Sequence, residues 1–89
     1  MISVAFKRLF SLHSEKFLKN AEKELYGRII KKLESLKENP FPSDAKRVVG
    51  RQEKIFRVRV GKYRIMYAVF YDKNEILIID IDKRDSIYE

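Results

Sequence analysis

The fold of this chain is decided by residues 56–67, which read Phe56-Arg57-Val58-Arg59-Val60-Gly61-Lys62-Tyr63-Arg64-Ile65-Met66-Tyr67. Apolar and basic residues alternate here, as in half-buried strands whose side chains point in turn to opposite faces. A two-residue loop, with Gly61 supplying the positive φ of a type II′ turn, joins the two strands into a hairpin. In that register Val60 lies opposite Tyr63, and Arg59 lies opposite Arg64.

The predicted hairpin places three arginines, Arg57, Arg59 and Arg64, on one face. Like charges directly opposite one another across two strands cost some tenths of a kcal/mol up to about 1 kcal/mol, so stability alone does not account for this arrangement. One interpretation is a solvated face on which the arginine stems cover apolar surface. We favour the other, an anion-binding site, because three arginines stand together beside aromatic residues.

The whole chain is short and basic. Its 89 residues carry 20 Lys and Arg against 13 Asp and Glu, a formal charge of +7. This length predicts a single domain, residues 1–89, with a small core, and the charge suits a polyanion or an acidic protein partner. With no cysteine and one histidine, we expect no disulfide, no catalytic metal and no cofactor. No stretch fits a signal peptide or a membrane span, so we expect a soluble, cytoplasmic protein.

Upstream of the hairpin, the pattern predicts one strand and two helices. Residues Ile2 to Phe6 alternate loosely and fit a first strand. From an N-cap at Ser14, apolar residues then recur at helical spacing until Asn39-Pro40, where proline ends the helix. A single helix over 14–38 would span about 37 Å, longer than a domain of this mass. We therefore expect a break near residues 20–23.

Downstream, we expect strands at 46–49, 54–60, 64–71 and 75–82, antiparallel because their connections are short. From Tyr63 onward, odd-numbered apolar residues join Phe56, Val58 and Val60 in the core beneath the helices, including Tyr63, Tyr67, Tyr71, Leu77, Ile79 and Ile81. The even positions of the last strand are polar, namely Asp80, Asp82 and Arg84, which brings Arg84 to the arginine face. Phe70 shares that face, whereas His13 falls in a loop away from it.

The order of these elements and three local matches resemble the RelE/ParE superfamily of small β-sheet toxins. The matches cover nearly the whole chain and comprise the hairpin 56–67, the helix end Leu33-Glu34-Ser35-Leu36-Lys37-Glu38-Asn39-Pro40 and the closing Asp82-Lys83-Arg84-Asp85-Ser86-Ile87-Tyr88. The resemblance implies an α+β, RelE-like fold, in which a twisted antiparallel β-sheet carries two N-terminal helices packed on one face.

RelE-like toxins of type II toxin–antitoxin systems are ribosome-dependent endoribonucleases that cut mRNA in the decoding site. The resemblance therefore implies a metal-independent mRNA interferase with a RelB-like antitoxin as partner, and contacts with mRNA and rRNA on the ribosome. Arg64 matches the hairpin arginine of the family's active site, Arg84 the second arginine of the last strand, and Tyr88 a C-terminal tyrosine. Arg57 and Arg59 fall where the family places basic residues.

Cleavage of RNA by its own 2′-OH needs a base, stabilisation of the phosphorane charge and a proton for the leaving 5′ oxygen. Arginines supply the second need but stay protonated, whereas adjacent cations lower the pKa of a tyrosine. We expect Tyr88 to be the base and Arg84 the proton donor. The expected catalytic residues are Arg59, Arg64, Arg84 and Tyr88, and the expected RNA-binding residues are Lys54, Arg57, Lys62, Phe70 and Lys83.

Two alternatives remain open from the sequence. ParE-like relatives share the fold but inhibit DNA gyrase. They generally lack the full set of basic residues and tyrosine, and the presence of this set here favours the RelE-like interpretation. The other alternative is a toxin relative that has lost activity and only binds an antitoxin.

Overall fold

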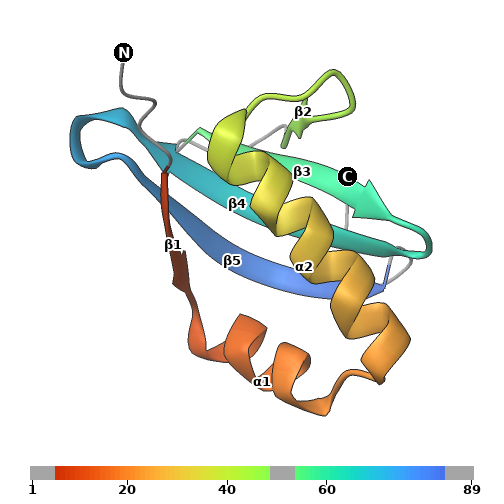
Figure 1. Cartoon of the computed structure of the whole chain (residues 1–89). Helices are drawn as coiled ribbons and strands as arrows, with labels where there is room; N and C mark the ends of the chain where they lie inside the picture. The colour runs from red at the N-terminus through yellow and green to blue at the C-terminus, as the bar shows by residue number, and fades with distance from the viewer. Residues whose placement is uncertain (1–5, 49–53, 84–89) are drawn as a thin grey trace.

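The computed structural model describes residues 6–48 and 54–83, and the predicted order of elements is confirmed within them (Figure 1). The elements are β1 (Lys7–Phe10), α1 (Leu12–Asn20), α2 (Lys23–Glu38), β2 (Lys46–Arg47), β3 (Ile55–Val60), β4 (Tyr63–Phe70), the 3₁₀ helix η1 (Tyr71–Lys73) and β5 (Glu75–Lys83). None of the helices in this part of the chain combines the length and hydrophobicity needed to cross a membrane.

The strands form one sheet in the order β1-β5-β4-β3-β2. Neighbours from β2 to β5 are antiparallel, as their short connections predict. β1, however, pairs in parallel with the first half of β5, from Lys7 opposite Glu75 to Phe10 opposite Ile78. The prediction of a purely antiparallel sheet is therefore wrong in this detail. Most of the chain separates β1 from β5, so no short connection constrains their direction.

The hairpin has the predicted register, with Arg59 opposite Arg64 and Val60 opposite Tyr63. Gly61 adopts φ +60°, and Lys62 does not have positive φ, as a type II′ turn requires. The guanidinium of Arg28 on α2 lies against this turn, so close that a Cβ on Gly61 would meet its Nη2 at 2.6 Å. Glycine therefore serves both the turn and the close approach of the helix.

The N-terminal boundaries differ from the prediction. The predicted strand Ile2–Phe6 lies mostly outside the described residues, and the observed β1 begins at Lys7, because pairing with β5 rather than local alternation decides where the strand runs. Ser11 is the N-cap of α1, and its Oγ accepts a hydrogen bond from the Ser14 backbone N–H at 3.1 Å. The break between the helices is confirmed, since α1 ends at Asn20 and α2 begins at Lys23.

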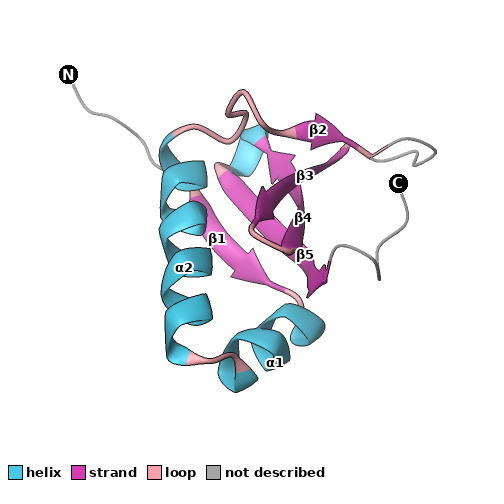
Figure 2. Cartoon of the chain, turned by 90° about the vertical axis from the view of Figure 1, so that its right-hand side faces the viewer, coloured by secondary structure: helices cyan, strands magenta, loops and turns pink. Residues whose placement is uncertain are grey.

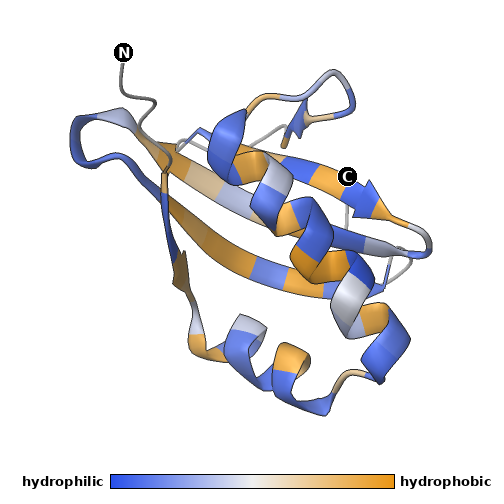
Figure 3. Cartoon of the chain, in the orientation of Figure 1, coloured by the Kyte–Doolittle hydropathy of each residue, from blue (hydrophilic) through white to orange (hydrophobic). Residues whose placement is uncertain are grey.

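The main core lies between α2 and the sheet (Figures 1 and 2). α2 buries Ile29, Leu33 and Leu36 there. Their buried partners from the strands are Val58, Val60, Ile65, Tyr67, Ile76, Ile78 and Ile81. Figure 3 shows apolar residues along the central strands that α2 crosses, while much of the outer side of the helix is hydrophilic. The predicted amphipathic helix thus covers the predicted apolar face of the hairpin.

A bulge in β5 changes the predicted core. Met66 pairs with Asp80 but the next residue, Tyr67, pairs with Ile78, so Ile79 is an extra residue in β5. A bulge reverses the alternation of side chains along a strand. Ile78 therefore joins the main core, whereas Ile79 packs with Val48, Ile55 and Met66 on the opposite face. The prediction is right for Ile81, and it is wrong for Leu77 and Ile79.

The three tyrosines predicted for the core have different environments. Tyr67 is fully buried. Tyr63 is half-buried with its ring edge-on to Phe17, 5.5 Å between centroids. Tyr71 lies in η1 and is 61% exposed, so its assignment to the core is wrong; β4 ends one residue before it, and its ring only borders those of Phe6 and Phe41.

Tyr67→Phe is expected to lower the free energy of unfolding by about 1–2 kcal/mol. The Tyr67 hydroxyl donates a hydrogen bond to the Pro40 carbonyl oxygen at 2.6 Å in a buried environment, and the variant leaves that carbonyl without this donor. Urea denaturation measures the change. Tyr26→Phe, at a position 45% exposed on α2, is the matched control and should stay within about 0.5 kcal/mol of the parent. Equal losses in both variants would contradict the assignment.

Candidate functional site

The turn of the hairpin brings Arg59 and Arg64 together from β3 and β4. They are directly opposite one another in the ladder. Arg59 is exposed, but Arg64 is only 2% exposed, which the alternation of residues did not predict. Because burial leaves Arg64 few conformations, its guanidinium is held in place before any ligand arrives. The pair thus combines a buried cation, Arg64, with a solvent-exposed one, Arg59.

A hollow of about 210 Å³ lies on the arginine side of β3. Its cationic lining comes from Arg57, Arg59 and Lys46, and Lys46 of β2 stands directly opposite Arg57. Asp44 also borders this hollow. A hydrogen bond from Lys32, 2.7 Å from the Asp44 carboxylate, lowers the pKa of that carboxyl. Asp44 is therefore ionised at neutral pH, with its charge balanced by Lys32.

A second hollow, of about 440 Å³, lies between α2 and β3. It is lined by Arg28, Lys31 and Lys32 of α2 together with Arg59, Val60 and Ser35. Arg59 borders both hollows because β2 pairs only with Phe56 and Arg57, which leaves the hairpin end of β3 at the edge of the described sheet. The basic surface therefore continues around this edge from one face of the sheet to α2.

The basic residues of α2 and Lys46 were not among the residues predicted for the site. Lys31 and Lys32 alternate with acidic residues along α2, as on any solvated helix. What identifies them is their position beside Arg59, and that depends on how α2 packs across the sheet. The sequence contained only a weak indication of Lys46. A residue in a strand antiparallel to β3 lies on one of two faces, and one of these is the face of Arg57.

The other predicted site residues fall into two groups. Lys62 in the turn and Lys83, which pairs with Tyr63, are exposed at the same end of the sheet as Arg59 and Arg64. Exposed Lys54 and Phe70 lie at the other end; Phe70 is six positions along β4 from Arg64, or about 20 Å. The structure therefore does not bring these two together with the arginines. Arg84 and Tyr88 lie outside the described residues.

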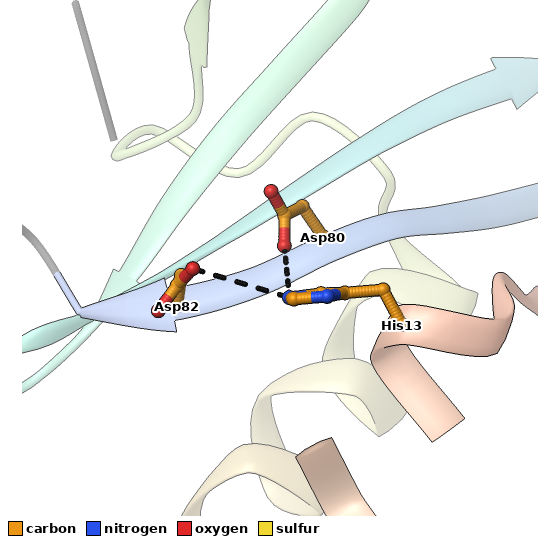
Figure 4. Close-up of side chains that lie close together, drawn as sticks. All are labelled: His13, Asp80 and Asp82. Atoms are coloured by element: carbon orange, nitrogen blue, oxygen red, sulfur yellow. Dashed lines mark ion pairs between the residues drawn. The ribbon is translucent and has the colours of Figure 1, made fainter. Parts of the chain in front are cut away.

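His13 lies closer to the arginine face than predicted. It belongs to the first turn of α1, and its Nε2 is 2.8 Å from Asp80 Oδ1 and 3.9 Å from Asp82 Oδ2 (Figure 4). Asp82 in turn lies opposite Arg64 in the ladder. The placement of His13 in a loop away from this face is therefore wrong. The start of α1 docks on β5 just beyond the end of β1, which the sequence did not show.

The cations of this site suit the binding of an anion and the stabilisation of charge that develops on it. Proton abstraction is a separate need, and the buried Tyr67 does not meet it. Burial, and to a smaller extent the charge on Asp44, raises the pKa of the Tyr67 hydroxyl well above its ordinary value. Tyr67 therefore stays protonated and serves the fold.

Comparison with known proteins places the chain in a class of small toxins. Residues 5–88 match the family described as the ParE toxin of type II toxin–antitoxin system, parDE. The chain belongs to the RelE/ParE family of type II toxin–antitoxin toxins. It is 42% identical over 60 residues to the RelE1 toxin of Methanocaldococcus jannaschii, a match covering 64% of this chain and 66%, just under two thirds, of that relative.

Solved structures of RelE toxins share the fold. The archaeal RelE–RelB complex from Pyrococcus horikoshii matches with a TM-score of 0.79 and 23% identity, over 93% of this chain and 99% of that one. Isolated RelE from E. coli matches with a TM-score of 0.77 and 21% identity, over 89% and 84%. The RelB–RelE complex from Methanococcus jannaschii matches with a TM-score of 0.69 and 28% identity, over 91% and 95%. The predicted RelE-like α+β fold is confirmed.

Proposed function

We propose that this protein is an endoribonuclease that cleaves ribosome-bound mRNA at the decoding site. The observation that carries the proposal is the pairing of exposed Arg59 with buried Arg64 at the hairpin. The exposed guanidinium of Arg59 offers a phosphodiester charge-assisted hydrogen bonds, and the positive charge of Arg64 lies beside it. The likeness to RelE1 supports the RelE-like interpretation of the chain, which implies this activity.

In the proposed reaction, the ribose 2′-OH loses its proton and its oxygen attacks the adjacent phosphorus. The bond to the 5′ oxygen of the next nucleotide breaks, and that oxygen takes up a proton. Arg59 and Arg64 hold the phosphate and stabilise the extra negative charge of the phosphorane. We assign the base to Tyr88, on the resemblance and on the chemistry of a phenol beside cations, and the donor to the leaving oxygen to Arg84, which matches the second arginine of the family's site.

The basic surface beyond the arginine pair is proposed to hold the RNA. Lys46 and Arg57 on one side of β3, and Arg28 and Lys31 on the other, line hollows that meet at Arg59. Such cations contact phosphates without reading sequence. Lys62 and Lys83 extend the surface at the hairpin end, where contacts with mRNA or rRNA are expected. Lys54 and Phe70 stand too far along the sheet to contact the scissile phosphate.

A RelB-like antitoxin is the expected protein partner. The structures of RelE with RelB from Pyrococcus horikoshii, E. coli and Methanococcus jannaschii support this, since the present fold matches the toxin in each. A chain with a formal charge of +7 favours an acidic partner.

Inhibition of DNA gyrase is the second candidate function, and the family description as a ParE toxin favours it. The two functions differ in the molecule that is damaged. A nuclease leaves cut mRNA, whereas a gyrase inhibitor leaves mRNA intact and causes DNA breaks to accumulate.

Purified protein added to a cell-free translation reaction is expected to produce new mRNA 5′ ends at the ribosomal decoding site, read by primer extension. The same mRNA without ribosomes should be cut far less, because the proposed site holds a strand that the ribosome presents. Translation is stopped before the products are analysed. Intact mRNA together with inhibited gyrase supercoiling would overturn the nuclease assignment in favour of the gyrase function.

A further inference from the structure

We propose that His13, Asp80 and Asp82 form a binding site for a divalent transition-metal ion, with Zn²⁺ the best fit. One imidazole nitrogen and one oxygen from each carboxylate lie within 4.8 Å of one another (Figure 4). These residues come from α1 and β5 and take no step in the proposed cleavage of RNA. The site therefore stands independently of that function.

The spacing of the three ligand atoms fits a first-row metal. Zn–N and Zn–O bonds near 2.1 Å in a tetrahedral site separate two ligand atoms by about 3.4 Å. The separations from His13 Nε2, 2.8 Å to Asp80 Oδ1 and 3.9 Å to Asp82 Oδ2, lie on either side of this value, and the two carboxylate oxygens are within 4.8 Å of each other. His13 is exposed and the two aspartates are half-buried, so their side chains have freedom to turn toward a bound ion.

Hydrogen bonds of neighbouring residues fix the segments that carry the three ligands. Ser14 Oγ donates a hydrogen bond to the Ile78 carbonyl oxygen at 3.1 Å, and Ser11 Oγ donates one to the Ile79 carbonyl oxygen at 2.6 Å. Both fix the start of α1 against β5. Asp82 Oδ1 accepts a hydrogen bond from the Lys83 backbone N–H at 2.9 Å, and Asp82 Oδ2 is the oxygen that faces His13. A fixed backbone and an oriented carboxylate are what metal sites require.

The local charge favours a cation although the chain as a whole is basic. Two carboxylates converge on a single imidazole, which is neutral when it binds a metal. The other charged groups close by are Lys16 and Glu22, which border the same hollow of about 400 Å³ as His13 and Asp82, and Arg64 opposite Asp82. The hollow leaves room for water as a fourth ligand. A nitrogen ligand with two carboxylates favours Zn²⁺ or Ni²⁺ over Mg²⁺ and Ca²⁺.

Isothermal titration of the full chain, prepared without a histidine tag, is expected to show one Zn²⁺ bound per molecule and much weaker binding of Mg²⁺. His13→Ala and Asp82→Asn should each weaken Zn²⁺ binding at least about tenfold. Lys16→Ala is the matched control, because Lys16 borders the hollow on the same helix without supplying a ligand, and it should bind Zn²⁺ as the parent does or more tightly. No Zn²⁺ binding, or equal binding by all four proteins, overturns the proposal.

A second measurement remains decisive if a variant fails to fold. His13 is the only histidine of the chain and cysteine is absent, so the imidazole resonances in an NMR spectrum of the parent protein report on this residue alone. Adding Zn²⁺ should shift them in proportion to occupancy, and adding Mg²⁺ should not. Imidazole resonances that do not move at saturating Zn²⁺ would show that His13 pairs with Asp80 and binds no metal.

Discussion

Arg64→Ala is expected to slow ribosome-dependent mRNA cleavage by roughly 10²–10³-fold, the usual loss when one donor aimed at developing charge is removed. Arg64 lies opposite Arg59 in the ladder and is 2% exposed, so its charge is held in one place beside Arg59. Growth arrest on expression should be relieved in parallel. Arg64→Lys should recover only part of the rate, because an ammonium keeps the charge but loses the planar fork.

Because Arg64 is buried, its replacement also affects the stability of the fold. A variant at Arg59 distinguishes a loss of cleavage from a loss of stability. Arg59 is exposed, so Arg59→Ala should slow cleavage while the denaturation midpoint stays unchanged. Lys73→Ala removes a positive charge in η1, at the opposite end of β4 from the hairpin, and should leave cleavage intact. Unchanged cleavage in both arginine variants would refute the assigned site.

Leu33→Ala is expected to lower the free energy of unfolding by about 3 kcal/mol, within the 2–5 kcal/mol typical of fully buried leucines. Leu33 is inaccessible to solvent in the core between α2 and the sheet, and the variant leaves a cavity there. Since domains of this size have little stability to spare, the variant should be partly unfolded at elevated temperature.

Leu12→Ala is the matched control for this prediction. The chemical change is the same, but Leu12 is 84% exposed at the start of α1, and a change within about 0.5 kcal/mol is expected. Thermal and urea denaturation measure both variants. A loss at Leu12 as large as that at Leu33 would show that Leu12 is buried in solution, by a partner or a second copy of the chain.

The hairpin was predictable because everything that fixes it is local. Gly61 permits one turn type, and the alternation on either side sets the register from Val60 and Tyr63 outward. The parallel pairing of β1 and the bulge at Ile79 were not predictable, since both arise where segments distant in sequence meet. The bulge alone moved Ile78 into the core and Ile79 out of it, although both are isoleucines in one apolar run.

The candidate site was predictable to a similar extent. Strand alternation placed Arg57, Arg59 and Arg64 on one face without any structure. It did not reveal that Arg64 is buried, because burial depends on what covers a face and not on which face a residue occupies. Nor did it reveal that α2 adds cations beside Arg59, or that His13 docks against β5.

The shortness of β2 has a consequence for the free protein. In the described part of the chain, no strand pairs with the outer side of β3 beyond Arg57, which leaves backbone donors and acceptors there for any extended chain. Sheet edges of this kind promote self-association unless charge protects them. Arg59 projects at this edge, with Lys62 exposed in the turn beside it. Positive charges at these residues, which are proposed to hold RNA, disfavour pairing of this edge with the same edge of a second copy of the chain.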